Sequence, residues 1–326
     1  MSRDPSQIFW SPFLAFGDSW IERIAPAIFR VAPKSVLASF AAGLAHTRPI
    51  KWYPGWKFGD GEFDGDQHHR LRRSIWEYYR DTRLDAPFVI PWYDNLRVTM
   101  YLGNDMSLCL YVAGTYEPNE FMFLGQVLRP GMTFIDVGAN DGLYTLFASS
   151  RVGAGGRVFA LEPSSREFNR LQRNLRFNGA SNVVALRQAA ADRSGTASLR
   201  LAEFGHEGLN TLGQFAYSIE QQASEEVSLI PLDSLIAPGK LERVDILKMD
   251  VEGGELNALK GAQSLLAMHK PLILIEIVES ALKHQGASRD AVLDFLQSFG
   301  YRFLVFGSNG RPEPVSSVTV DGVNIV

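Results

Sequence analysis

Carboxylate side chains follow four of the apolar segments in the second half of the chain, and they are the first sign of chemistry in the sequence. Asp136 opens a glycine-rich turn that ends at Gly142, and Glu162 follows the next apolar segment. Asp250 and Glu276 come at the ends of two later segments. A carboxylate buried without a partner costs free energy, so such groups must pair with local donors or with a ligand. The pattern indicates a site that carries several negative charges.

The turn after Asp136 has the residues that a tight strand-to-helix connection needs. Gly138 and Gly142 adopt left-handed torsions cheaply and let a ligand approach the main chain. Asn140 stands where the dinucleotide-binding pattern G-x-G-x-x-G has its middle glycine, which argues against a bound pyrophosphate. A nucleoside without phosphate fits better, with Glu162 on its ribose hydroxyls. The positive sulfur and ammonium of S-adenosylmethionine match an acidic edge. A tight turn with a solvated or helix-capping acid is the structural alternative.

The elements that must position these acids alternate between apolar strands and amphipathic helices. Strands are expected at 133–137, 157–161, 183–189, 244–249, 271–277 and 301–306, with a short closing strand at 323–326. Helices are expected at 117–128, 144–150, 164–178, 255–266 and 289–298, the third with a capping box of Ser164 and Glu167. Two further strands are expected at 96–101 and 108–113, around a turn at 103–105. This order predicts a mostly parallel α/β sheet that is covered on both faces and binds ligands at its carboxyl edge.

Composition excludes several classes of protein. The chain has 326 residues, of which 46% are hydrophobic and 21% charged, which is typical of a globular protein and not of a disordered chain or a coiled coil. The formal net charge is −4, so no basic excess predicts a nucleic-acid partner. Cys109 is the single cysteine, which suits a reducing compartment. Neither a secretory signal nor a membrane-spanning segment is expected, and the predicted location is cytoplasmic.

Residues 1–95 are predicted to form a helical or irregular N-terminal extension, and residues 96–326 the ligand-binding domain. The apolar stretch 8–44 is expected to form short helices that pack on a core or on a second copy in a homodimer. Peripheral contact with a membrane or a lipid-linked substrate is the alternative. The acidic loop at 60–66 is similar to a calcium loop, but Leu71 stands where a bidentate Glu is required.

Lys248 lies inside the expected strand at 244–249, on the same side as Asp250. A buried lysine must be paired or lose its proton. One interpretation is an ion pair with Asp136, Asp250 or Glu276 that orders the ends of the strands. The other is that Lys248 orients a carboxylate or a substrate hydroxyl.

Five segments together resemble the FkbM-type methyltransferase family, a branch of the S-adenosylmethionine-dependent methyltransferases. They are YEP (116–118), DVGANDG (136–142), FALEP (159–163), LDSL (232–235) and LKMDVEGGE (247–255). The resemblance implies a Rossmann-like, doubly wound sheet of seven strands whose last strand is antiparallel. It also implies O-methylation of a hydroxyl on a sugar or a secondary-metabolite scaffold.

The resemblance also implies roles for particular residues. The methionine part of the cofactor would lie on Asp136, Gly138, Asn140 and Gly142, the ribose on Glu162, and the adenine near Ala190 and Asp192. The stretch 116–120, which includes the cofactor-binding candidate Glu117, would close over the cofactor from the N-terminal side, and Asp250 would border the methyl donor.

An alcohol acceptor must lose its proton, so a general base is expected within hydrogen-bond reach. The candidates are Asp250, Glu252 and His206. Glu252 and Glu255 can instead complement a helix dipole. His206 lies in the stretch 201–227, which interrupts the alternation of strands and helices and is expected to be a substrate lid. The alternative is that His206 is a surface histidine without a role.

Competing interpretations come from other classes of protein and chemistry. A nicotinamide-dependent oxidoreductase is disfavoured by Asn140. A binding module that keeps the nucleoside pocket without turnover is the non-enzymatic alternative. Mg²⁺ on Asp250 and Glu276 is a further alternative, although no metal is expected.

Overall fold

The computed structural model describes residues 27–45, 69–236, 241–307, 309–318 and 323–325. The chain passes from one compact unit to a second between Tyr116 and Glu117. The expected acidic loop at 60–66 and the apolar residues 8–26 lie outside the described residues. The expected contacts of residues 1–95 with a substrate, a membrane or a second copy stay predictions.

The described part of the first unit includes two longer helices and a short hairpin of strands. The helices are α3 (Lys34–Leu44) and α4 (His69–Thr82), and the antiparallel strands are β1 (Phe88–Pro91) and β2 (Arg97–Met100). The expected strand at 108–113 is wrong, because these residues form one π-helical segment, Leu108–Ala113, after the short helix α5 (Asp105–Ser107). Asn104 caps this helix by accepting a hydrogen bond from the Ser107 amide. A continuous apolar run does not distinguish a strand from a buried helix.

The second unit is built on a sheet of eight strands, one more than the seven expected. In chain order the strands are β3 (Thr133–Val137), β4 (Arg157–Leu161), β5 (Val183–Leu186), β9 (Ile246–Met249), β10 (Leu272–Ile277), β11 (Leu304–Phe306), β12 (Pro312–Pro314) and β13 (Val323–Ile325). Their spatial order is β12-β11-β13-β10-β9-β3-β4-β5. The five strands from β10 to β5 are parallel, and β13 pairs antiparallel with β10, as expected for the last strand. The additional strand is β12, which pairs with β11 at the edge.

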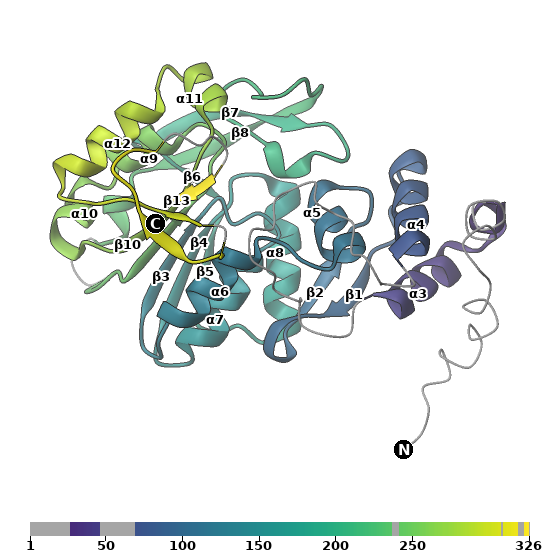
Figure 1. Ribbon diagram of the computed structural model, residues 1–326. Coiled ribbons are helices and arrows are strands. Elements are labelled where there is room, and N and C mark those ends of the chain that lie inside the picture. Colours follow the sequence, from purple (N-terminus) through teal and green to yellow (C-terminus); the bar gives the residue numbers. More distant parts are fainter. Residues whose placement is uncertain (1–26, 46–68, 237–240, 308, 319–322, 326) are drawn as a thin grey trace. The chain divides into compact units, whose positions relative to one another are not determined.

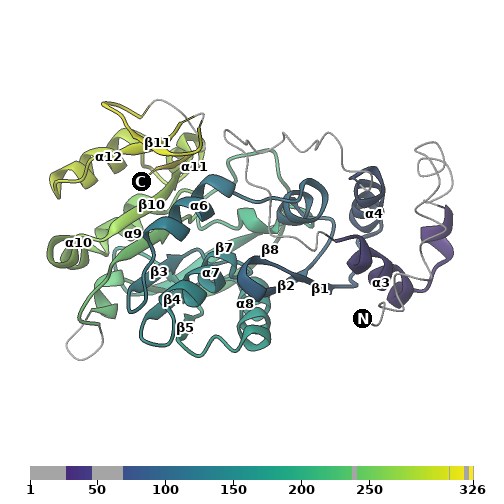
Figure 2. The same cartoon turned by 60° about the horizontal axis from the view of Figure 1, so that its bottom comes forward.

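Helices cover both faces of this sheet (Figures 1 and 2). The helices are α6 (Pro118–Val127), α7 (Leu143–Val152), α8 (Ser165–Asn178), α9 (Glu255–Lys260), α10 (Gln263–His269), α11 (Glu279–His284) and α12 (Arg289–Ser298). The core on one face joins β3, β9 and β10 to α9, α10 and α12, with Leu247, Met249 and Leu259 fully buried. Helices α6, α7 and α8 lie on the other face. The sheet therefore has the doubly wound, mostly parallel architecture that the alternating sequence predicts.

A second, three-stranded sheet corrects two expectations. It consists of β6 (Gln188–Ala190), β8 (Gln221–Ile230) and β7 (Gly195–Ala202) in that order. The expected strand at 183–189 is therefore divided, because β5 pairs with β4 whereas β6 leaves to pair with β8. The stretch 201–227 is not one long loop, since β7 and β8 form an antiparallel hairpin and enclose a shorter connection.

Two expected helix features also differ. The helix expected at 255–266 is interrupted at Gly261, where an added Cβ would lie 1.9 Å from the main-chain oxygen of Ala191. This close approach leaves room only for glycine. The expected capping box is absent at α8, because Ser164 donates its hydroxyl proton to Glu167 Oε2 and makes no side-chain bond to the helix amides. Within the described residues, no helix combines the length and the apolar character that crossing a membrane requires.

Candidate functional site

The turn between β3 and α7 is packed so closely that its glycines have structural reasons of their own. Gly138 has a φ of +77°, and an added Cβ would lie 1.8 Å from the main-chain oxygen of Asp250. Gly142 has a φ of +90°, and an added Cβ would lie 2.4 Å from a methyl carbon of Leu171. The turns that follow β3 and β9 are therefore in direct contact. Packing alone accounts for both glycines, and their expected contact with a ligand stays a prediction.

Lys248 lies in β9, beside Asp136 of β3 in the register of the two strands. Its Nζ donates a hydrogen bond of 3.2 Å to the main-chain oxygen of Gly138 and lies 3.4 Å from Asp250 Oδ2 and 3.8 Å from Asp136 Oδ1. Burial acts to lower the pKa of Lys248, but the carboxylates around it, led by Asp250, raise that pKa above its ordinary value. The ion-pair interpretation of Lys248 is therefore confirmed. Its catalytic role stays a prediction.

Asp136 is fully buried at the end of β3. Its Oδ2 accepts a hydrogen bond of 2.6 Å from the Thr145 hydroxyl, whereas Oδ1 has no hydrogen-bond donor in the described part of the chain. Burial raises the pKa of Asp136, while Lys248 and Thr145 act against that shift. Asp136 thus keeps an acceptor atom that a cationic group could use.

Glu117 reaches the same end of the sheet from the N-terminus of α6. Its Oε2 accepts a short hydrogen bond from the hydroxyl of Tyr144, whose ring stacks on Phe121 of α6 with the centroids 4.5 Å apart. The Lys248 ammonium lies 4.9 Å from the centre of the Tyr144 ring, within cation–π range. Burial, followed by the charge of Glu120, raises the pKa of Glu117 to about 8. Tyr144 therefore joins Glu117 and Lys248, a role that the sequence did not suggest.

Three more carboxyl groups lie at the ends of β9 and β10. Asp250 directly follows β9, Glu276 is the second-last residue of β10, and Glu252 lies in the turn before α9. Burial raises the pKa of Glu252 and of Glu276, and the charge of Asp250 raises both further. The charge of Glu117 also raises the pKa of Glu276 and that of Lys248 lowers it, so these three charged groups belong to one neighbourhood. We use the name Lys248 cluster for Lys248 with Glu117, Asp136, Asp250, Glu252 and Glu276.

Glu255 is buried and binds main-chain amides of the turn that precedes it. Its Oε1 accepts hydrogen bonds of 3.2 Å from the amides of Val251 and Gly253, and burial raises its pKa to about 7. The acid at the start of α9 therefore holds the turn that carries Glu252. It binds main-chain amides at a helix start, as expected for a carboxylate that complements a helix dipole.

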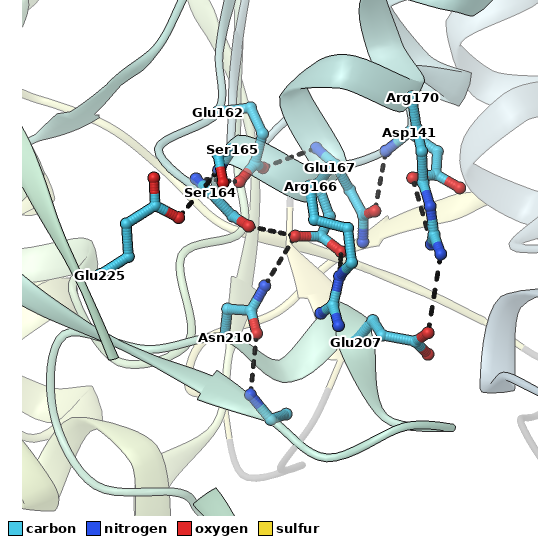
Figure 3. A network of polar contacts seen from close by, with 12 residues as sticks. Asp141, Glu162, Ser164, Ser165, Arg166, Glu167, Arg170, Glu207, Asn210 and Glu225 are labelled. Atoms are coloured by element: carbon cyan, nitrogen blue, oxygen red, sulfur yellow. Dashed lines mark hydrogen bonds and ion pairs between the residues drawn. The ribbon is translucent and has the colours of Figure 1, made fainter. Parts of the chain in front are cut away.

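Glu162 belongs to a second polar network, drawn in Figure 3. Its Oε2 accepts a hydrogen bond from the amide of Asn140, and its Oε1 accepts one from the amide of Ser164, both of 2.9 Å. Burial, followed by the charge of Glu167, raises the pKa of Glu162 to about 8. Glu162 thus joins the turn after β3 to the turn after β4. The expected ribose contact is untested.

The same network contains Asp141, which the sequence left without a role. Arg170 of α8 lies 3.8 Å from Asp141 Oδ1 and 3.7 Å from Glu207 Oε1 (Figure 3). Burial raises the pKa of Asp141 to about 7, although Arg170 acts against the shift. His206 precedes Glu207 in the connection between β7 and β8 and is half-buried. The part of His206 as a base stays a prediction.

The two residues expected near an adenine lie past β5. Ala190 ends β6 and is buried in the core with Leu161 and Leu232. Asp192 is exposed, and its carboxylate lies 3.7 Å from the guanidinium of Arg193. Their contact with a ligand is untested. Within the described ranges, no group of three or more His, Cys, Asp or Glu side chains is arranged to hold a metal ion.

Sequence comparison places the chain among known proteins. The pattern of the methyltransferase FkbM domain matches residues 136–303, which is more than half of the chain. The hexuronic acid methyltransferase AglP of Haloferax volcanii is 29% identical over 131 residues, which are 40% of this chain and 50% of that protein. The methyltransferase sdnD of Sordaria araneosa is 30% identical over 213 residues, 57% of this chain and 79% of that protein. The chain thus spans only half the length of the hexuronic acid enzyme.

Comparison with solved structures gives a weaker similarity. The crystal structure of the methyltransferase FkbM from Methylobacillus flagellatus KT is 18% identical, with a TM-score of 0.39. The similarity covers 68% of this chain and 52% of that one. The sequence match at residues 136–303 includes the turn after β3, Glu162 and most of the Lys248 cluster. The chain belongs to the FkbM family of S-adenosylmethionine-dependent methyltransferases.

Proposed function

We propose that this protein uses S-adenosylmethionine to methylate a hydroxyl group of an uncharged acceptor, a carbohydrate or another polyol. The observation that carries the proposal is the Lys248 cluster: the Lys248 ammonium lies 3.4 Å from Asp250 Oδ2 and 3.8 Å from Asp136 Oδ1, and the charges of Glu117, Glu252 and Glu276 interact with that of Lys248. In a doubly wound sheet, ligands bind at the carboxyl edge. The excess of carboxyl groups favours a cationic ligand.

S-adenosylmethionine fits these carboxyl groups. Its ammonium and sulfonium charges suit the cluster, and Asp136 Oδ1 is a buried acceptor with capacity to spare. Glu162 accepts one main-chain amide on each oxygen, and a carboxylate oxygen has a second lone pair for a ribose hydroxyl. The residues proposed to hold the cofactor are Glu117, Asp136, Gly138, Asn140, Gly142, Glu162, Ala190, Asp192 and Asp250.

The bound cofactor supplies a methyl group on a positively charged sulfur. The protein's own part is to orient the acceptor, exclude water and take the hydroxyl proton. Glu252 is the favoured base, because burial and the charge of Asp250 raise its pKa and so make it a stronger proton acceptor once ionised. Lys248 holds Asp250 in place through their 3.4 Å contact. Asp250 and His206 stay alternatives for the same step.

The charge of the cluster also bears on the acceptor. The hexuronic acid methyltransferase is named for an anionic sugar. A carboxylate placed beside Asp250 would meet a like charge, and Lys248 is already engaged with Asp250, Asp136 and Gly138. Like charges in close contact cost several kcal/mol unless a cation compensates. We therefore expect neutral hydroxyls to be accepted and uronate carboxylates to be rejected.

The direct test is transfer of labelled methyl from S-adenosylmethionine to two matched panels, one of neutral sugars and polyols and one of uronic acids. Binding of S-adenosylmethionine and of NAD is measured first by calorimetry. Asp250→Asn should abolish transfer, whereas Asp290→Asn, on the exposed side of α12, should leave it unchanged. Binding of NAD but not of S-adenosylmethionine would refute the proposal. Binding of S-adenosylmethionine without transfer to any acceptor would favour the non-catalytic module.

A further inference from the structure

Glu252 has an unusual main-chain conformation for a residue with a long side chain. Its φ is +52°, in the left-handed region that non-glycine residues rarely adopt. Gly253 follows with a φ of +98°, and an added Cβ there would lie 2.4 Å from the main-chain oxygen of Ala281. The turn is thus pressed against α11. Such a conformation persists only where surrounding contacts hold it.

Two side chains from different elements provide those contacts. The hydroxyl of Thr211 donates a hydrogen bond of 2.8 Å to the main-chain oxygen of Glu252. The amide of Gln285, just after α11, donates one of 3.1 Å to the same oxygen and lies 3.4 Å from the Thr211 hydroxyl. One carbonyl therefore accepts hydrogen bonds from two side chains of different elements.

Thr211 is itself rigidly held. It is buried, and its amide and carbonyl exchange hydrogen bonds of 3.1 and 2.8 Å with Arg200 of β7. Its hydroxyl also accepts a hydrogen bond of 3.0 Å from the amide of Gly213. At Gly213 an added Cβ would lie 2.5 Å from the side chain of Gln285, so the two segments are in close contact. The small sheet is thereby connected to the turn that carries Glu252.

We propose that Thr211 and Gln285 are positioning residues, which fix the main chain of Glu252 so that its carboxyl faces Asp250 and the acceptor hydroxyl. The inference rests on the proposed function for the role of Glu252 as a base. The charged groups that act on Glu252 are Asp250, Glu255 and Lys248, and Glu276 in turn responds to Glu252. If the main chain at residue 252 relaxed, the carboxyl would turn away from these charges and toward water.

The test uses Thr211→Val, which keeps the shape of the side chain but removes the hydroxyl, with Thr211→Ser as the conservative control. Gln285→Leu removes the second donor and serves as an independent variant. Carbon-13 NMR of glutamate-labelled protein reports the titration of each carboxyl group, and the Glu252 signal is assigned by its loss in Glu252→Gln. Urea unfolding and circular dichroism confirm that each variant is folded.

We expect the titration midpoint of Glu252 to fall measurably toward the ordinary range of a glutamate carboxyl in Thr211→Val and in Gln285→Leu. Thr211→Ser should keep the midpoint of the unmodified protein. An unchanged midpoint in both folded variants would overturn the inference. The measurement needs neither cofactor nor acceptor, so failure of S-adenosylmethionine to bind would count against the proposed function and not against this result.

Discussion

Removing the Lys248 charge is the most informative perturbation of this protein. Lys248→Met keeps the length and apolar stem of the side chain but takes away the one cation of the Lys248 cluster. In the unmodified protein the ammonium lies 3.4 Å from Asp250 Oδ2 and 3.8 Å from Asp136 Oδ1. With an effective dielectric constant of about 20, each contact at such distances is worth about 4–5 kcal/mol before desolvation is counted.

The net loss is smaller, because the lysine no longer has to be desolvated. Removing one partner of a buried ion pair typically costs about 3–5 kcal/mol. We expect Lys248→Met to lower the free energy of unfolding by that amount at pH 8. The cost should shrink at lower pH. Glu117 has a folded pKa of about 8, above its unfolded value, so the stability it contributes is complete below the unfolded pKa and lost as the pH rises through the folded one. Loss of the lysine raises such pKa values further and deepens this loss.

Urea titrations at pH 5.5 and pH 8 measure both effects. The control is Lys260→Met, at the exposed end of α9, for which a change within about 0.5 kcal/mol is expected at either pH. A loss below about 1 kcal/mol at pH 8 would mean that the carboxyl groups are compensated without Lys248. An equal loss at both pH values would mean that protonation of the acids does not relieve the cluster. Either result would refute the charge argument.

Three further outcomes follow from the site. Glu162→Gln should weaken binding of S-adenosylmethionine by about 1–3 kcal/mol in calorimetry, which is the cost of leaving buried polar groups poorly paired. Unchanged affinity would mean that Glu162 does not contact the ribose. In thermal unfolding, Gly138→Ala should destabilise the protein far more than Gly153→Ala, although both glycines have positive φ. An added Cβ would lie 1.8 Å from the main-chain oxygen of Asp250 at Gly138 and would meet nothing within 4 Å at Gly153. Affinity for S-adenosylmethionine should rise with pH up to about 8, with release of protons, because a cationic ligand favours the ionised form of Glu117. Calorimetry in two buffers with different ionisation enthalpies measures this release, and proton uptake would contradict the prediction.

The sequence predicts the central sheet well, for a physical reason. Strands β3 and β4 are buried apolar runs bounded by glycines or charged residues, and both lie at the predicted residues. The acids after β3 and β9 also meet at one edge, because the carboxyl ends of parallel strands lie side by side. Where no such rule applies the prediction was wrong, as at 108–113, where a continuous apolar run is compatible with either a strand or a helix.

Long-range contacts explain why the rest was missed. Nothing in the local sequence marks Tyr144 as a partner of Glu117, or Thr211 as a donor to Glu252, because each pair is joined only by folding. The same holds for Gly261, whose role depends on the backbone of a distant segment.

The sequence pattern could not predict that the acids are divided between two networks. Strand-end acids look equivalent in the sequence, yet Asp136 and Asp250 face a lysine, whereas Glu162 binds main-chain amides beside Arg166 and Arg170. The proposed function would use such a division, because the ribose hydroxyls need a positioned hydrogen-bond acceptor and the sulfonium needs negative charge nearby. Glu162, tied to two turns, suits the first need, and the Lys248 cluster suits the second. Exchanging their environments would not preserve binding, even with the same number of carboxyl groups.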